Sequence, residues 1–307
     1  MFLVCGEALF DVFPDEAKQP AAFKMNARAG GSPFNVAIGL SRLEQPAALL
    51  TGISYDELGR RLLQMLETEG VDTRYIVRTG RRTTIVMINL DDAGVPNYSF
   101  YGVGSADCGI TEQELIEVGS DITGIHFGSY SMVVKPVADA FAKLLQNHTD
   151  KLISVDPNIR PTIEPDMNLW RESFWQYAKH ADLFKISAED IDELYPGRDH
   201  HDLALALIEA GVQLVTITDG ANAAKCWTAN HLTASVKPAI ANVVDTVGAG
   251  DTFQSALLAK LLQWGNAKQR IRALTQDDLN ELIRFAVKAA SITCSRQGAD
   301  LPRLSQL

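Results

Sequence analysis

Residues 243–262 read VVDTVGAGDTFQSALLAKLL and place three small residues, Gly248, Ala249 and Gly250, directly before Asp251. The apolar residues that follow recur at helical spacing, so the small residues supply backbone N–H groups at a helix N-terminus. Such a terminus attracts anions because its N–H groups have no intrahelical partner and lie at the positive end of the helix dipole. Asp251 is either a helix-end acid that complements this dipole or a general base beside a bound phosphoryl group, the geometry that phosphoryl transfer needs.

A second pair of adjacent glycines, Gly30 and Gly31, lies in the stretch ARAGGSPFNVAIGLSRL at residues 27–43. Adjacent glycines let a ligand or another backbone approach closely. Pro33 suits the first turn of a helix, and Ser32 can cap that helix. Asn35 follows in the same turn, where its amide can reach a ligand hydroxyl. A tight turn before a capped helix is the alternative explanation.

Neither glycine stretch matches a common nucleotide-binding motif. The sequence contains no GxxxxGK[ST] loop and no GxGxxG after its first strand, which argues against a P-loop and against NAD-dependent chemistry. The net charge of −10, from 28 Lys and Arg against 38 Asp and Glu, argues against general nucleic-acid binding. A phosphorylated ligand would therefore have to be held by local backbone amides.

The rest of the chain alternates strand patterns with helix patterns. Short apolar runs predict strands at 2–6, 47–53, 83–90, 152–156, 182–187 and 213–218. Periodic apolar residues predict helices at 56–70, 135–148 and 201–211. This alternation is typical of an α/β fold whose mostly parallel sheet is covered by helices on both faces.

Two regions interrupt the alternation. Residues 11–30 are predicted to be irregular or to form short strands, and residues 83–105 are predicted to form a hairpin around the turn DDAG. We expect a single domain over residues 1–307, with β-lid insertions at about 11–30 and 83–105.

Cysteine usage and the N-terminal stretch bear on the compartment. The four cysteines form no CxxC pair, which favours reduced thiols over a zinc site or disulfides. The stretch MFLVCGEALFDVFPD lacks the basic region of a signal peptide, and no apolar run is long enough to span a membrane. We therefore expect a soluble, cytoplasmic protein.

The two glycine stretches, about 210 residues apart, resemble the signature motifs of the ribokinase-like carbohydrate kinases, also called the phosphofructokinase-B type. These motifs are AGGSPFNVAIGLSRL and DTVGAGDTF, and SVDPNIRP resembles a stretch typical of fructokinases. The resemblance covers nearly the whole chain. It implies a ribokinase-like α/β fold with a small β-sheet lid, and transfer of the γ-phosphoryl group of ATP to a primary hydroxyl of a sugar, with fructose as the first expectation.

The resemblance also implies individual roles. Asp251 matches the catalytic base, and the amides of Gly248, Ala249 and Gly250 match the anion hole. The residues implied to bind the sugar are Asp11, Gly30, Gly31, Asn35, Tyr101 and Arg160. Those implied to bind ATP are Lys185, Ser187, Thr218 and Gly220. Asp190 is implied as a Mg²⁺ ligand, and Asp245, Val247 and Gly298 as the site of a monovalent cation such as K⁺.

Some positions depart from the family pattern. The common Asn-x-x-Glu element appears as SAED, the nucleotide loop has Ala223 in place of a second glycine, and Gly102 and Val103 replace an Arg-Glu pair of many fructokinases. The last change leaves 2-keto-3-deoxygluconate, ribose and nucleosides open as alternative substrates. A non-catalytic sugar-binding regulatory protein on the same fold is the alternative from another class. The family resemblance further implies a homodimer formed through the lid.

Overall fold

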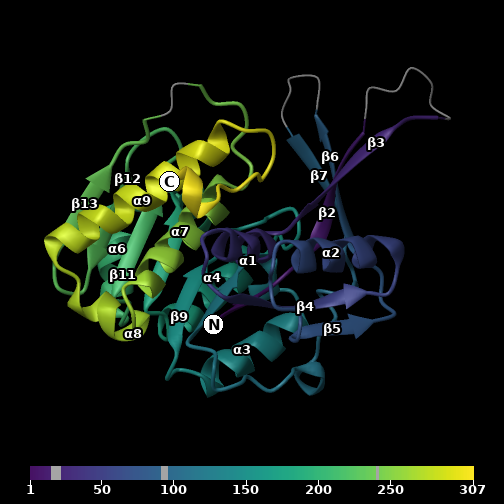
Figure 1. The fold of residues 1–307 in the computed structure, drawn as a ribbon, viewed down its shortest axis with the longest axis horizontal. Coiled ribbons are helices and arrows are strands. Elements are labelled where there is room, and N and C mark those ends of the chain that lie inside the picture. Colours follow the sequence, from purple (N-terminus) through teal and green to yellow (C-terminus); the bar gives the residue numbers. More distant parts are fainter. Residues whose placement is uncertain (15–21, 91–95, 240–241) are drawn as a thin grey trace.

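Two β-sheets of different size form the framework of the protein (Figure 1). The computed structural model describes residues 1–14, 22–90, 96–239 and 242–307. Within them, one sheet has nine strands in the order β13-β12-β11-β10-β9-β8-β1-β4-β5, and the other has four in the order β3-β2-β6-β7.

The large sheet is parallel except at one edge, where β12 and β13 run antiparallel. Its strands are β1 (Phe2–Cys5), β4 (Ala47–Ser54), β5 (Ile76–Thr79), β8 (Gly124–Gly128), β9 (Leu152–Asp156), β10 (Leu183–Ser187), β11 (Leu214–Thr218), β12 (Ala224–Thr228) and β13 (Thr233–Val236). Side chains alternate between its faces: Phe2 and Val4 join one hydrophobic cluster, and Leu3 and Cys5 join the other. Both faces are therefore buried, as the apolar strands predicted.

Helices cover both faces of this sheet (Figure 1). The first face packs against α1 (Ser32–Arg42), α2 (Glu57–Thr68), α7 (Ala249–Gln263) and α9 (Gln276–Cys294), with the short α8 (Ala267–Arg270). The second packs against α3 (Val137–Asn147), α4 (Met167–Ala178), α5 (Ala188–Leu194) and α6 (His200–Glu209). The helices predicted at 56–70, 135–148 and 201–211 are α2, α3 and α6. No helix of the described residues is long and apolar enough to cross a membrane.

The small sheet is the β-lid, made of β2 (Leu9–Pro14), β3 (Met25–Gly30), β6 (Thr84–Leu90) and β7 (Pro96–Tyr101). Strand β2 pairs antiparallel with β3 and parallel with β6, and β6 pairs antiparallel with β7. The small sheet expected from residues 11–30 and 83–105 is confirmed, although its first strand begins at Leu9. The predicted turn DDAG lies outside the described residues.

Four strands of the large sheet escaped the sequence patterns. Strand β8 reads GIHFG, where a central histidine and two glycines interrupt the apolar run. Strand β12 reads AKCWT and is interrupted by an exposed lysine, β13 alternates exposed and half-buried residues, and β5 has only four residues. The antiparallel edge β11-β12-β13 was therefore not predicted, because short half-exposed strands carry a weak apolar signal.

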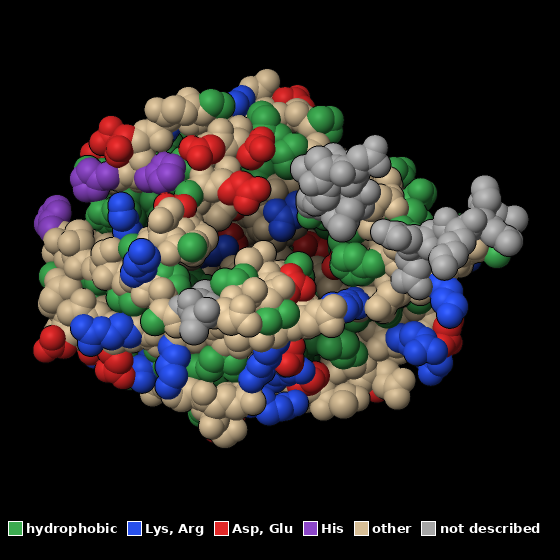
Figure 2. All heavy atoms as spheres, turned by 90° about the horizontal axis from the view of Figure 1, so that it is seen from above, with side chains coloured by type: hydrophobic (Ala, Val, Ile, Leu, Met, Phe, Trp, Pro, Cys, Tyr) green, Lys and Arg blue, Asp and Glu red, His purple; other side chains and the backbone are tan. Residues whose placement is uncertain are grey.

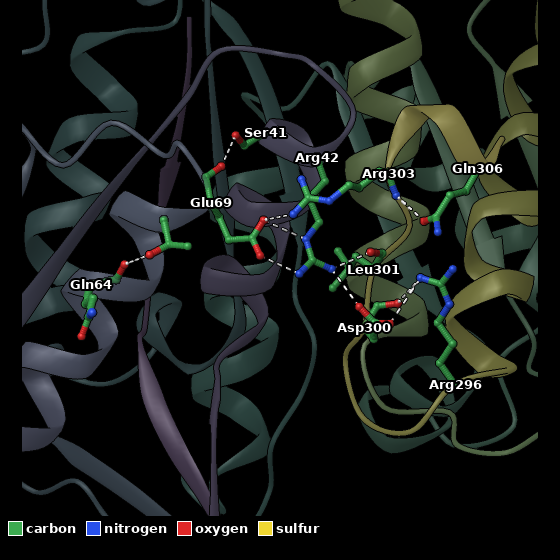
Figure 3. Close-up of polar contacts among 10 residues, drawn as sticks. Ser41, Arg42, Gln64, Glu69, Arg296, Asp300, Leu301, Arg303 and Gln306 are labelled. Carbon is green, nitrogen blue, oxygen red and sulfur yellow. Dashed lines mark hydrogen bonds and ion pairs between the residues drawn. The ribbon is translucent and has the colours of Figure 1, made fainter.

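A partly buried ion-pair network ties the C-terminal segment to α1 and α2 (Figure 3). The guanidinium of Arg42 donates to both oxygens of Glu69, at 3.0 and 2.7 Å, and also to the Leu301 carbonyl at 2.6 Å. Arg303 adds a contact to Glu69 at 3.1 Å. The side chains of Arg42 and Glu69 are only 14% and 10% exposed, so solvent screens their pair weakly.

Replacing Arg42 with alanine should destabilise the protein by about 3 kcal/mol, because Glu69 would keep its charge with only Arg303 beside it. The shift in the urea unfolding midpoint measures this cost. Arg60→Ala is the matched control, since Arg60 makes a similar pair with Glu57 in an exposed position and should cost less than about 1 kcal/mol. Equal losses in the two variants would show that the Arg42 network contributes no more than a surface pair.

Candidate active site

The carboxyl ends of the parallel strands, the N-terminal ends of α1 and α7, and the β-lid meet on one side of the molecule. Strands β9, β10 and β11 end here at Asp156, Ser187 and Thr218. Open α/β sheets place their ligands at this edge. Figure 2 shows a hollow in the molecular surface with acidic and basic side chains at its bottom.

Asp251 lies in the first turn of α7, whose N-cap is Gly248. Its side chain is buried, with 8% of the residue exposed. Oδ1 accepts a hydrogen bond from the Ser32 hydroxyl at 2.6 Å, and Oδ2 accepts one from the Asn35 amide at 2.8 Å. The two glycine motifs of the sequence, one on each helix, therefore meet at this carboxylate.

The prediction that Ser32 caps α1 is wrong. Gly31 is the N-cap of that helix, with φ of +108°, and no side chain of the described residues caps it. A Cβ at Gly31 would lie 2.8 Å from the Glu7 carbonyl oxygen, so this close approach requires glycine. Ser32 is the first helical residue, and its hydroxyl is committed to Asp251.

Asp11 on β2 belongs to the same cleft. Burial raises the pKa of Asp11 to about 6, while the nearby charge of Arg160 lowers it and that of Asp251 raises it. Gly30 leaves room for this carboxylate, because a Cβ there would lie 2.6 Å from Asp11 Oδ2. The structure thus places Asp11, Gly30 and Arg160 near Asp251, and their role in binding a sugar stays a prediction.

A buried ion pair lies beneath the N-terminus of α7. Lys185 Nζ donates to Asp156 Oδ2 at 2.7 Å, and both side chains are 5% exposed or less. Burial by itself lowers the pKa of Lys185, but the carboxylates of Asp156, Asp190 and Asp251 together raise it by more, so the ammonium stays charged. A Cβ added to Gly250 would lie 3.0 Å from Nζ. Glycine at 250 therefore keeps open the space between the ammonium and the cleft.

The three residues before Asp251 differ in what their backbone can offer. Gly248 has φ of +77°, and a Cβ there would meet Ala299 at 2.6 Å, so only glycine fits. The Ala249 N–H donates to the Thr246 carbonyl at 3.2 Å. The Gly250 N–H has no backbone acceptor among the described residues. The Gly248 N–H likewise has no backbone acceptor among the described residues, so both glycine amides are open to an anion, and Gly250 is the one beside Lys185 Nζ.

Ser187 and Asp190 form a capping box at the start of α5. The Ser187 hydroxyl donates to Asp190 Oδ2 at 2.6 Å, and the Asp190 N–H donates back to that hydroxyl at 3.0 Å. Asp190 Oδ1 accepts the Ile159 N–H at 2.8 Å. Both side chains therefore have structural partners, and no cluster of three metal-ligating side chains occurs in the described part of the chain.

The residues expected at a monovalent-cation site do lie together. Asp245 Oδ1 accepts the Val247 N–H at 3.0 Å, and Asp245 Oδ2 accepts the Gly298 N–H at 2.8 Å. The carboxylate thus joins the segment before α7 to the loop after α9. These contacts use N–H donors, so in this arrangement Asp245 serves as a structural tie.

The remaining residues predicted to bind ligands lie around the rim of the cleft. Thr218 ends β11, and Gly220 follows it with φ of +47°. Arg160 is exposed and donates to the Ile159 carbonyl at 2.7 Å. Tyr101 ends β7 on the lid and is 60% exposed.

Two contributors were missed by the sequence patterns. Glu7 is only 2% exposed and accepts the Ser32 N–H through Oε1 at 3.1 Å. The second is Asp156, which ends the strand predicted at 152–156 and whose partner, Lys185, no sequence pattern indicated. An acid inside the apolar stretch FLVCGEALF was the available signal for Glu7, since charged residues are rarely buried without a role.

Known proteins resemble this chain over its length. The model of the pfkB family carbohydrate kinases matches residues 1–306. A fructokinase of Rhizobium leguminosarum bv. trifolii is 38% identical over 263 residues, which cover 85% of this chain and 79% of that protein. Probable fructokinase-4 of Arabidopsis thaliana is 32% identical over 307 residues, with 96% and 90% covered.

The fold also matches that of a solved fructokinase structure. The crystal structure of a fructokinase with bound ATP from Xylella fastidiosa superposes with a TM-score of 0.89 at 26% identity, covering 99% of this chain and 96% of that one. The family match spans both glycine motifs, which the structure joins at Asp251. The chain belongs to the pfkB family of carbohydrate kinases.

Proposed function

We propose that this protein is an ATP-dependent fructokinase, which transfers the γ-phosphoryl group of ATP to a primary hydroxyl of fructose. The observation that carries the proposal is the buried carboxylate of Asp251 at the N-terminus of α7, close to the Lys185 ammonium. A base on one side and positive charge on the other are what phosphoryl transfer requires. Similarity to fructokinases, one of them with bound ATP, supports the choice of substrates.

The sugar would lie between the large sheet and the β-lid. Asp11 offers a carboxylate to its hydroxyls, Asn35 offers an amide, and Arg160 offers a cation at the rim. Gly30 leaves room for the Asp11 carboxylate, and Gly31 lets the start of α1 pack against the Glu7 carbonyl, so both glycines help to place the groups that would bind the sugar. Closure of the β-lid over the sugar would exclude water, which otherwise competes with the sugar as phosphoryl acceptor.

ATP would lie across the ends of β10 and β11, near Thr218 and Gly220, with its γ-phosphoryl group at the Gly250 amide. Asp251 takes the proton of the sugar hydroxyl as the new O–P bond forms, and the bond between the γ-phosphorus and the bridging oxygen breaks to release ADP. Lys185 offsets negative charge on the transferring group, because Asp156 takes one of its three N–H donors and the others can serve the anion.

Mg²⁺ would reach the site on the phosphates of ATP, where it supplies charge neutralisation. Asp190 fits a ligand role poorly because its oxygens already accept three protein hydrogen bonds, so it would act on the metal at most through water. K⁺ binds oxygen atoms, so it would be held beside the tie that Asp245 forms, by its carboxylate and the Val247 carbonyl, with Gly298 as a further candidate. Higher turnover in K⁺ than in choline salts would support this part of the proposal.

The proposal also includes a cytoplasmic location and a homodimer formed through the β-lid. The lid region exposes apolar side chains, among them Phe23 at 51% and Met25 at 54%, which suit a subunit interface. All four cysteines are free and buried, which fits a reducing compartment. Sedimentation analysis at several protein concentrations tests the dimer.

An ADP-release assay with fructose, 2-keto-3-deoxygluconate, ribose and adenosine tests the substrate. We expect the highest kcat/KM with fructose. A higher kcat/KM with another substrate would mean that the protein is a kinase of the same family with a different acceptor. The replacement of the Arg-Glu pair of many fructokinases by Gly102 and Val103 would then account for the difference. No turnover with any of them, together with sugar binding in calorimetry, would support a regulatory protein instead.

Replacing Asp251 with asparagine should lower kcat by about 10²–10⁴-fold, the contribution typical of a general base, while ATP and fructose still bind. Steady-state kinetics and calorimetry measure the two effects separately. Asp277→Asn, which changes an exposed acid on α9, is the matched control and should leave kcat unchanged. Turnover of Asp251→Asn near that of the control would exclude Asp251 as the base.

Replacing Gly250 with valine should lower kcat by about 10²-fold, since its side chain would occupy the space between Lys185 Nζ and the phosphoryl group. The loss should appear in kcat with ATP and leave the KM for fructose nearly unchanged. Gly80→Val is the control, because a Cβ at Gly80 meets no atom of the described part of the chain within 4 Å. An unchanged kcat in Gly250→Val would mean that the anion lies elsewhere.

A further inference from the structure

The Asp251 carboxylate is held by two donors from α1, one on each oxygen. Ser32 Oγ lies 2.6 Å from Oδ1, and Asn35 Nδ2 lies 2.8 Å from Oδ2. All three residues are buried, with 6% to 8% of each exposed. At 2.6 Å the serine contact is in the range of short, charge-assisted O–H···O⁻ hydrogen bonds. This donor was expected to cap α1, so its assignment to the base is a finding of the structure.

The two donors differ in how freely they can exchange partners. The backbone of Ser32 is fixed, because its N–H donates to Glu7 Oε1 at 3.1 Å and the preceding residue, Gly31, packs against the Glu7 carbonyl. Its hydroxyl has a single proton, which goes to Asp251. The Asn35 amide carries two N–H donors, so it can serve the carboxylate and a substrate hydroxyl at once.

We propose that Ser32 is a positioning residue for phosphoryl transfer: its hydroxyl holds Oδ1 of Asp251, turns Oδ2 toward the sugar, and keeps the carboxylate ionised. This inference rests on the proposed function. In the reaction the sugar proton moves to Oδ2 while the sugar oxygen bonds to the γ-phosphorus and ADP leaves with the electrons of the broken P–O bond. Ser32 keeps its own proton throughout, and Asn35 shares Oδ2 with the incoming hydroxyl.

The hydrogen bond from Ser32 to Asp251 affects the pKa of the carboxylate. Burial raises the pKa of Asp251, and the hydrogen bonds from Ser32 and Asn35 oppose that rise, followed by the charges of Lys185 and Arg160. Because catalysis needs the ionised carboxylate, activity falls as the pH drops through this pKa. Removing a donor to the charged form raises the pKa further, so the acidic limb of activity moves to higher pH.

Other titratable groups also face the site. Asp11 faces Asp251 from β2, and Asp156 and Lys185 face it from β9 and β10. Glu7 contacts Ser32 from the connection between β1 and β2, and burial raises its pKa to about 8. A serine-to-alanine change leaves all these groups in place. The difference between the profiles of wild type and variant therefore reports on Asp251.

The test is the pH dependence of kcat/KM for fructose in Ser32→Ala, from about pH 5 to about pH 9, where raised carboxyl pKa values fall. The acidic limb should move up by about one pH unit, the size expected for a lost hydrogen bond to a charged group. Activity should therefore fall about tenfold below the limb and much less above it. If Ser32→Ala does not fold, Ser32→Cys provides the same test, with a weak donor of similar size.

Ser255→Ala is the matched control, because Ser255 is a buried serine on α7 whose hydroxyl donates to the Thr252 carbonyl at 3.0 Å. Its acidic limb should coincide with that of the wild type. A Ser32→Ala profile that coincides with the wild type, or a Ser255→Ala profile that shifts equally, would overturn the proposal.

An NMR titration of the Asp251 carboxyl carbon, assigned by its loss in Asp251→Asn, gives a readout that needs no substrate. The pKa of Asp251 should be higher in Ser32→Ala than in the wild type, and equal values would overturn the proposal. If the wild type fails to phosphorylate fructose while this pKa still shifts, the proposed substrate has failed and the role of Ser32 stands.

Discussion

The cost of keeping one buried carboxylate ionised shapes the centre of this protein. Asp251 is 8% exposed, and burial disfavours its charge. Two donors from α1 and the nearby ammonium of Lys185 counter that cost. They come from α1 and β10, so they meet only if both pack correctly against α7. The ionised state of Asp251 therefore depends on how the helices pack on the large sheet.

The ion pair under α7 shows how this arrangement serves chemistry. Asp156 ends β9 and Lys185 lies within the neighbouring β10, where a buried salt bridge adds little stability because its desolvation is costly. What the ion pair contributes instead is a fixed positive charge next to Gly250. Gly250 lets that charge face the cleft, in the way that preorganised donors act on a developing anion. The same geometry explains why small residues precede the acid.

The sequence predicted the local features of the fold more completely than it predicted the contacts between residues far apart in the chain. The start of α7 before Asp251 and the strands β9, β10 and β11 followed from glycines and apolar runs. The hydrogen bond from Ser32 to Asp251 spans 219 residues, and no local pattern encodes it. The pairing of Asp156 with Lys185 depends on the register of β9 against β10, which sequence periodicity does not specify. Local rules therefore placed Ser32 at a cap, and tertiary packing gave it another partner.

A structure of the protein with fructose and a non-hydrolysable ATP analogue tests the central claim most directly. We predict a primary hydroxyl of the sugar within hydrogen-bond reach of Asp251, about 2.6–3.2 Å, with the γ-phosphate at the Gly250 amide on its far side. A sugar whose nearest hydroxyl lies on Asp11, with Asp251 bound only to its protein donors, would contradict the account.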